Sequence, residues 1–190
     1  MSSHHIVKEQ QEPALIVDFF QDLDLELLGQ LLEWAPTVIA NQESAQWLSE
    51  RNIHVDVVLG VGDHHGIKQD GLTFLRGNSA SFKEIALNYL VEKGYQAVNI
   101  LSQELPIDLF HRFTSLINLV FINGERKVFA IKSGFKKWKP AGEVIHILAN
   151  ETLFQTKGLK KEGHQQYQTT KDGFFEIHFQ TAHLLIAENL

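Results

Sequence analysis

The hydrophobic pattern of this chain changes its period near residue 122, and this change restricts the fold more than any other feature. Before it, short apolar runs alternate with longer segments in which apolar residues recur at helical spacing. After it, short alternating runs follow one another, beginning around Asn123-Gly124, a dipeptide typical of tight hairpins. The chain is therefore predicted to be α/β followed by all-β. We expect a parallel-sheet α/β domain over 12–122 and a β-sandwich-like domain over 123–190.

The first domain has the order strand, helix, strand, helix along most of its length. Parallel neighbours in a sheet need long crossover connections, so this order favours a parallel sheet covered by helices. In this domain, strands are expected at 13–17, 37–40, 55–59 and 98–101, and helices at 23–34, 44–51, 79–93 and 106–119. In the second domain, strands are expected at 127–131, 143–148, 174–179 and 183–187.

The composition argues against several classes of protein. The 190 residues contain no cysteine, which removes thiol catalysis, thiolate metal sites and disulfides. The 17 basic and 23 acidic residues give a net charge of −6, which argues against phosphate neutralisation along nucleic acid as the main source of affinity. No run of 18 apolar residues occurs, and residues 1–11 are polar, so neither a membrane span nor a signal peptide is expected. We expect a cytoplasmic protein with no nucleic-acid or membrane partner.

The loop Gly60 to Gly66, with the sequence GVGDHHG, is the best candidate site on topological grounds. It follows a predicted strand of the parallel sheet, and ligands of such sheets bind beyond the carboxyl ends of the strands. Within it, Asp63 is a candidate Mg²⁺ ligand, and His64 or His65 is a candidate for metal binding or proton transfer. The alternative is that the glycines turn the chain and that the three polar residues are only solvated.

The segment Lys132 to Lys139, with the sequence KSGFKKWK, is the main basic and aromatic cluster. Such interleaving can bind single-stranded nucleic acid or nucleotide phosphates through charge and stacking. The more common explanation is a solvated hairpin edge, where lysines discourage pairing with another strand. Neither His111 nor Arg112 can be assigned to a cleft or to an exposed helix face from the pattern alone.

The order of these parts, together with several short sequence motifs, resembles the thiamin pyrophosphokinase family. In that family, the loop after the third strand reads Gly-Asp-x-Asp, and the segment 55–63 (VDVVLGVGD) is similar in register. Asp63 matches the second acid of the motif, whereas Val61 replaces the first. The resemblance thus assigns Asp63 as the catalytic carboxylate and as a ligand of Mg²⁺, with His64 beside it among the nucleotide-binding or substrate-binding residues.

The other acidic motifs of the family are depleted in this chain. Residues 84–95 resemble the helix that follows its Lys-Asp-x-Thr-Asp motif, but the motif itself reads NSASF over 78–82 and has no carboxylate. The family's Arg-x-Asp-His-x-x-x-Asn falls on 111–118 and keeps only Asn118.

Two polar residues stand where the family has an Asp-Gly pair at the end of the second strand. These are Asn41 and Gln42, and the resemblance assigns them, with Asn118, to nucleotide or substrate binding. In the β half, three segments resemble the thiamin-binding domain of the family: 139–147, 156–160 and 173–187.

The resemblance implies an enzyme that transfers diphosphate from ATP to thiamin, giving AMP and thiamin diphosphate, with Mg²⁺ as cofactor and a homodimer as the assembly. Transfer of this kind depends on cations that neutralise developing charge, so the carboxylates that hold Mg²⁺ are essential to it. One matching carboxylate remains here.

Three hypotheses follow. In the first, the enzyme works and other acids replace the missing ones, with Glu43, Asp70, Glu104 and Asp108 as candidates. In the second, the protein keeps the fold but not the activity, and it serves as a subunit that binds nucleotide, thiamin or a protein partner. In that case no cofactor is expected. The third, a metal-binding protein that uses His64 and His65, is weakened because adjacent residues of a strand point to opposite faces.

Overall fold

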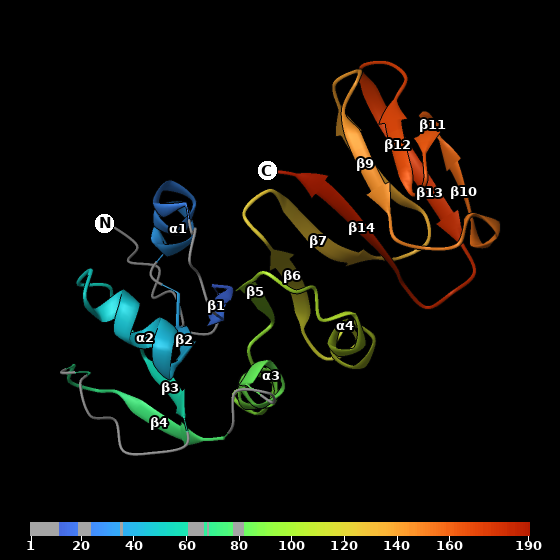
Figure 1. Cartoon of the computed structure of the whole chain (residues 1–190). Helices are drawn as coiled ribbons and strands as arrows, with labels where there is room; N and C mark the ends of the chain where they lie inside the picture. Colours follow the sequence, from blue (N-terminus) through green and yellow to red (C-terminus); the bar gives the residue numbers. More distant parts are fainter. Residues whose placement is uncertain (1–11, 19–23, 35, 61–66, 68, 78–81) are drawn as a thin grey trace, which may run out of the picture. The chain divides into compact units, whose positions relative to one another are not determined.

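The computed structural model describes residues 12–18, 24–34, 36–60, 67, 69–77 and 82–190 (Figure 1). The chain divides into two compact units, unit 1 over Met1–Gly124 and unit 2 over Glu125–Leu190. None of the helices in the described part of the chain has the length and apolar character that crossing a membrane requires.

Unit 1 contains a parallel sheet with the strand order β6-β5-β1-β2-β3-β4. The strands are β1 (Ala14–Asp18), β2 (Val38–Asn41), β3 (Val57–Gly60), β4 (Thr73–Arg76), β5 (Ala97–Ser102) and β6 (Asn118–Ile122). The helices are α1 (Leu25–Leu32), α2 (Gln42–Ser49), α3 (Phe82–Glu92) and α4 (Ile107–Phe113). This order of parallel strands and crossover helices is the α/β arrangement that the sequence predicts.

The inner strands β1, β2 and β3 of unit 1 have apolar side chains on both faces, as expected for a sheet that helices cover. In β1, β2 and β3, nearly every residue is buried. The helix α2 packs against β2 and β3, α3 packs against β1, and α4 packs against β6. One hydrophobic core of unit 1 joins α1 and α2 to the sheet. Its buried residues are Leu15, Val17, Leu28, Val38, Ala40, Ala45, Leu48, Val55, Val58, Leu101 and Ile122.

One predicted helix of unit 1 is shorter than expected. The sequence predicts a helix over 106–119, but α4 ends at Phe113 and the residues from Asn118 onward form β6. The reason is that Leu119, Phe121 and Ile122 are buried in the sheet, where β6 pairs with β5. Local helical spacing was outweighed here by the burial of a strand-forming segment.

Unit 2 consists of two antiparallel sheets, with the orders β11-β12-β9-β14-β7 and β10-β13-β8. The elements are β7 (Arg126–Ile131), β8 (Phe135–Lys139), β9 (Val144–Ile147), η2 (Glu151–Leu153), β10 (Phe154–Lys157), β11 (Leu159–Gly163), β12 (Gln166–Thr169), β13 (Gly173–Phe179) and β14 (Leu184–Asn189). Side chains of both sheets share one core, which contains Ile145, Ile147 and Ile186 from one sheet and Phe175, Ile177 and Phe179 from the other. This is a β-sandwich.

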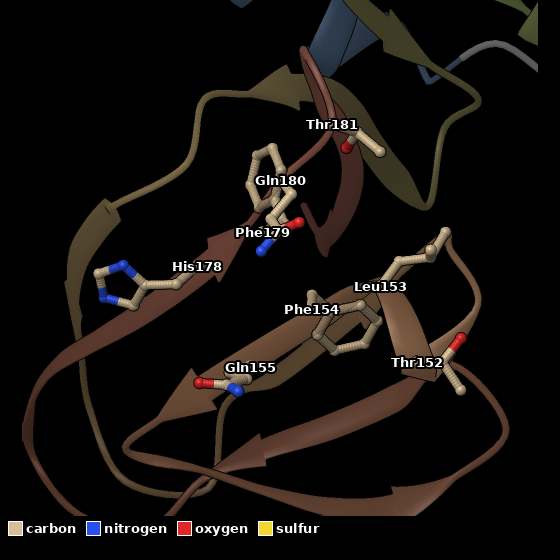
Figure 2. Close-up of a pocket in the computed structure, with 8 residues that line it drawn as sticks. All are labelled: Thr152, Leu153, Phe154, Gln155, His178, Phe179, Gln180 and Thr181. Carbon is tan, nitrogen blue, oxygen red and sulfur yellow. The ribbon is translucent and has the colours of Figure 1, made fainter.

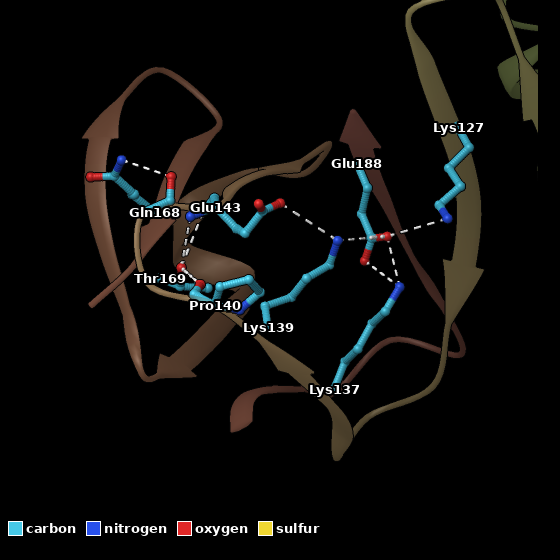
Figure 3. A network of polar contacts seen from close by, with 9 residues as sticks. Lys127, Lys137, Lys139, Pro140, Glu143, Gln168, Thr169 and Glu188 are labelled. Carbon is cyan, nitrogen blue, oxygen red and sulfur yellow. Dashed lines mark hydrogen bonds and ion pairs between the residues drawn. The ribbon is translucent and has the colours of Figure 1, made fainter. Parts of the chain in front are cut away.

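A buried carboxylate, Glu188 of β14, connects the two sheets of unit 2 (Figure 3). Its Oε2 atom lies 2.7 Å from the ammonium of Lys137, 3.6 Å from that of Lys139 and 3.7 Å from that of Lys127. Lys137 and Lys139 belong to β8 of the smaller sheet, and Lys127 belongs to β7 of the larger one. Much of the predicted basic cluster is therefore engaged in ion pairs that join the sandwich.

The connection between β10 and β11 requires a glycine. Gly158 has φ +78°, and a Cβ atom there would lie 3.0 Å from the carbonyl oxygen of Phe174 and 3.3 Å from the Cα atom of Phe175. Both are backbone atoms, which cannot rotate away. A side chain at position 158 would therefore add a steric clash to the strain of a left-handed conformation.

Gly158→Ala is expected to lower the free energy of unfolding of unit 2 by about 2–3 kcal/mol. The matched control is Gly134→Ala, where φ is +82° but no atom lies within 4 Å of the added Cβ. The control should lose only about 1 kcal/mol, because it carries the conformational strain without the clash. Urea denaturation of both variants measures the difference. Equal losses of unfolding free energy would show that the backbone around Gly158 shifts to relieve the clash.

Candidate functional site

The strand order of unit 1 reverses between β1 and β5. From β1 the chain adds β2, β3 and β4 on one side, and it then returns to place β5 and β6 on the other side. In open α/β sheets, ligands bind outside the carboxyl ends of the strands at such a switch point. The residues that end β1 and β5 are therefore the first to consider as a site.

Polar side chains meet at this position, and we name the four of them the Asp18 cluster: Asp18, Asn41, Lys83 and Ser102. Asp18, Asn41 and Ser102 are the last residues of β1, β2 and β5, and Lys83 lies in the first turn of α3. Because the strands are parallel, their last residues lie along the same edge of the sheet. The cluster thus follows from the topology of unit 1.

The carboxylate of Asp18 accepts hydrogen bonds from all three of its neighbours. The amide Nδ2 of Asn41 donates to Oδ1 at 2.9 Å, and the hydroxyl of Ser102 donates to Oδ2 at 3.2 Å. The ammonium of Lys83 forms an ion pair with Oδ2 and also donates to Oγ of Ser102 at 3.1 Å. Both carboxylate oxygens are therefore occupied by donors of the protein itself.

The cluster is only partly accessible to solvent. The side chain of Lys83 is 21% exposed and that of Asp18 is 19% exposed, while Ser102 is buried. The formal charges of Asp18 and Lys83 cancel. Attraction between them is stronger here than on an open surface, because partial burial lowers the effective dielectric constant. The cluster therefore presents a fixed ammonium group at the edge of the sheet.

Local structure explains why these side chains are held in place. Asn41 caps α2, since its Oδ1 atom accepts a hydrogen bond of 2.8 Å from the backbone N–H of Ser44, and the remaining amide group is free to reach Asp18. Lys83 follows Phe82, whose side chain is 1% exposed and anchors the start of α3 in the core. One capping residue and one buried aromatic residue thus orient the cluster.

The structure brings Asn41 and Gln42 to this edge of the sheet. Gln42 is the first residue of α2, and its Oε1 atom lies 3.1 Å from the point that a Cβ atom on Gly60 would occupy. Gln42 thus covers the end of β3. The nucleotide role of both residues remains a prediction.

Asn118 lies elsewhere. It is the first residue of β6 and pairs with Ala97, the first residue of β5, so it belongs to the edge opposite the Asp18 cluster. The structure does not bring it together with Asn41 and Gln42. The predicted catalytic and metal-binding residue Asp63, and the predicted ligand-binding residue His64, lie outside the described residues.

Asp18, Lys83 and Ser102 were not singled out from the sequence, although two of them carried a usable signal. Asp18 and Ser102 each follow directly on a buried apolar run, the position at which parallel strands present polar groups to ligands. Lys83 had no such signal, because only the tertiary fold brings it to Asp18, from which it is separated by 65 positions in the chain.

The described residues do not fit the Mg²⁺ ion that the sequence resemblance implies. Within the described ranges, no three His, Asp or Glu side chains gather as ligands of a metal ion. The acids considered as replacements, Glu43, Asp70, Glu104 and Asp108, are described and form no such group. Mg²⁺ requires near-octahedral oxygen coordination, and the carboxylate of Asp18 is already engaged by Lys83.

Arg112, which the sequence left unassigned, pairs with Glu84 on α3. The hydrogen bond from Arg112 lowers the pKa of Glu84 from its ordinary value, and it raises the pKa of Arg112 in return. Both side chains are exposed. The pair connects α4 to α3 at the surface, where such pairs add little stability.

A separate pocket of about 390 Å³ lies in unit 2 (Figure 2). It is bordered by η2 and β10 on one side and by the end of β13 on the other, and its lining residues are Thr152, Leu153, Phe154, Gln155, His178, Phe179, Gln180 and Thr181. Its volume is at the lower end of the range of ligand sites. The lining contains no lysine, arginine or carboxylate, so the Asp18 cluster is the stronger candidate for a phosphorylated ligand.

Comparison with known proteins identifies the fold. No protein-family model matches the chain, and no curated protein matches it. Solved structures do match: the combination of a parallel α/β unit and a β-sandwich is the fold of the thiamin pyrophosphokinases. This confirms, at the level of the fold, the resemblance predicted from the sequence.

Three of these structures show the extent of the likeness. The thiamine pyrophosphokinase from Bacillus subtilis gives a TM-score of 0.68 at 13% identity, covering 93% of this chain and 97% of the other. The thiamin pyrophosphokinase from Candida albicans gives 0.63 at 12% identity, with 96% and 90% covered. The yeast thiamin pyrophosphokinase gives 0.61 at 11% identity, with 98% and 88% covered. The likeness spans both units of the chain at very low sequence identity.

Proposed function

We propose that this protein binds a nucleotide at the carboxyl ends of β1, β2 and β5, on the thiamin pyrophosphokinase fold, without catalysing diphosphate transfer. The observation that carries the proposal is the pairing of Asp18 with Lys83 at the switch point of the sheet. The position is the one at which α/β sheets bind ligands. Its one described carboxylate is committed to an internal ion pair.

The chemistry of the Asp18 cluster supports binding. A lysine ammonium has three N–H donors, of which two are directed at Asp18 and Ser102, and the third is left for a ligand. Lysine is a common partner of phosphate groups. Hydroxyl and amide groups of the neighbouring Ser102 and Asn41 are held in fixed orientations, which reduces the entropy lost when a ligand binds.

The same cluster argues against turnover. Transfer of a diphosphoryl group from ATP depends on metal ions that bridge the phosphates and neutralise the developing charge. The described residues supply no group of carboxylates for that purpose. The ammonium group of Lys83 carries one positive charge that Asp18 already balances, so it cannot stabilise the charge that develops during transfer as a divalent ion would.

The test combines a turnover assay with a binding measurement on the full chain. With ATP, thiamin and Mg²⁺, we expect no AMP above the rate without protein, and isothermal titration should detect nucleotide binding. A thiamin pyrophosphokinase such as the Bacillus subtilis enzyme serves as the positive control for the assay. Steady AMP production dependent on thiamin would refute the loss of activity, and absence of binding by AMP, ADP and ATP would refute the proposed role.

The second candidate is a working thiamin pyrophosphokinase, favoured by the near-complete coverage of the chain by solved members of that fold. In that case Asp63 holds Mg²⁺, Asn41, Gln42 and His64 contribute to the nucleotide or substrate site, and unit 2 contributes to thiamin binding. Asn118 lies at the opposite edge of the sheet and would have no part in that site. The discriminating variant is Asp63→Ala. It should abolish any AMP production by the working enzyme and leave a metal-independent binding protein unaffected.

The resemblance also leads us to propose a homodimer and a cytoplasmic location. Light scattering on the eluted peak of a size-exclusion column gives the mass directly. A mass of one chain at micromolar concentration would exclude the dimer.

A further inference from the structure

We infer that the ammonium group of Lys83 takes the place of a divalent metal ion beside Asp18, so that a phosphorylated ligand binds at this edge of the sheet without Mg²⁺. The half of this inference that concerns the ligand rests on the nucleotide binding proposed above. The half that concerns the cation rests on the geometry of the Asp18 cluster alone.

The carboxylate of Asp18 is already surrounded by hydrogen-bond donors of the protein. Oδ1 accepts from Asn41, and Oδ2 accepts from both Lys83 and Ser102. A metal ion at Oδ2 would have to displace the ammonium of Lys83 or approach it closely, and two positive charges at such a distance repel strongly in a partly buried site. The internal ion pair therefore disfavours a second cation at this carboxylate.

The position of Lys83 depends on its neighbour Phe82. Phe82, the residue before it, stands where the resemblance places the last carboxylate of the Lys-Asp-x-Thr-Asp motif, and this phenylalanine is buried in the core. The buried ring fixes the first turn of α3, from which Lys83 reaches Asp18.

Metal binding by the ligand-free protein tests the cation directly. In 15N-labelled protein, Mn²⁺ should cause no selective broadening of the amide signals of Asp18 and Ser102, whereas in Lys83→Met it should broaden them because the carboxylate is released. Lys93→Met is the matched control, since Lys93 is exposed, follows the same helix and contacts Tyr89 instead. Selective broadening in the wild type, or none in Lys83→Met, would overturn the inference.

Ligand binding tests the consequence, with AMP as the probe because a monophosphate binds Mg²⁺ weakly in solution. The dissociation constant of AMP should agree within about twofold between buffers with MgCl2 and with EDTA, since no metal is shared. Lys83→Met should weaken binding by at least about tenfold, the loss expected for a charge-assisted hydrogen bond, and Lys93→Met should not change it. A tenfold or greater strengthening by Mg²⁺ would overturn the inference and point to a metal site of the Asp63 type.

A second variant and the Mn²⁺ experiment distinguish failure of this inference from failure of the proposed function. If Lys83→Met does not fold, Lys83→Gln retains an amide donor toward Asp18 without the charge, and the same two results are expected of it. If AMP, ADP and ATP bind under neither condition, the proposed function fails, while the Mn²⁺ experiment still decides whether Lys83 excludes a metal ion.

Discussion

Replacing Glu188 by glutamine is expected to lower the free energy of unfolding of unit 2 by about 3 kcal/mol, the loss typical of a buried ion pair that is broken on one side. Glutamine has nearly the same shape as glutamate, so the packing of β14 should be preserved. What disappears is the negative charge that lies within 3.7 Å of three ammonium groups. The partly exposed side chains of Lys127, Lys137 and Lys139 would then repel one another around a neutral side chain.

The measurement needs a signal from unit 2 alone. Of the three tryptophans, Trp138 is the one in unit 2, so a background with Trp34→Phe and Trp47→Phe makes urea unfolding report on that unit. Glu162→Gln is the matched control, because Glu162 forms an exposed ion pair with Lys160 at 2.9 Å. The midpoint should fall clearly for Glu188→Gln and barely for Glu162→Gln. Similar midpoints for the two variants would show that the buried cluster does not hold the sheets together.

Phe82→Asp is expected to destabilise unit 1 by at least about 4 kcal/mol, because it removes a buried aromatic side chain and places a charge where no partner awaits it. The substitution restores the residue type that the resemblance leads one to expect at this position. It should nevertheless restore neither Mg²⁺ binding nor AMP production, since the ring of Phe82 now belongs to the core.

Phe82→Leu separates the two contributions to this loss. It keeps an apolar side chain and should cost only about 1.5 kcal/mol or less. Fluorescence of Trp47, in a background with Trp34→Phe and Trp138→Phe, follows the unfolding of unit 1 because Trp47 packs against its core. A stable Phe82→Asp variant that gains Mg²⁺-dependent turnover would mean that the core does not depend on the ring and that the fold accepts an acid at this position.

The strands and helices that the sequence predicted correctly are those with strong periodic burial. β1, β2, β3 and β5 are almost entirely apolar, and α3 carries buried residues at helical spacing. β4 was not predicted, because its four residues alternate poorly and its burial is only partial at the edge of the sheet. The short strands β10, β11 and β12 were missed for a similar reason, since each has exposed polar residues and depends on pairing with distant strands. β8 lies at the edge of its sheet, in agreement with the more common explanation of the basic cluster.

The candidate site was less predictable than the fold. Asn41 and Gln42 were assigned by the resemblance, through a motif at the end of the second strand. A search for polar residues at the end of every predicted strand would also have found Asp18 and Ser102. Lys83 was beyond reach, since its role depends on a contact formed only when α3 packs on β1. Phe174 shows that residue type alone does not decide burial, since its side chain is 60% exposed while Phe175 and Phe179 on the same strand are buried.

The most direct test of nucleotide binding at the Asp18 cluster is a titration of 15N-labelled protein with AMP in EDTA, followed residue by residue. We expect the largest chemical-shift changes at Asp18, Asn41, Lys83 and Ser102, and we expect these changes to be lost in Lys83→Met but kept in Lys93→Met. Changes confined to unit 2, for example around the pocket at Phe154 and Phe179, would contradict this expectation, as would changes that appear only when Mg²⁺ is added.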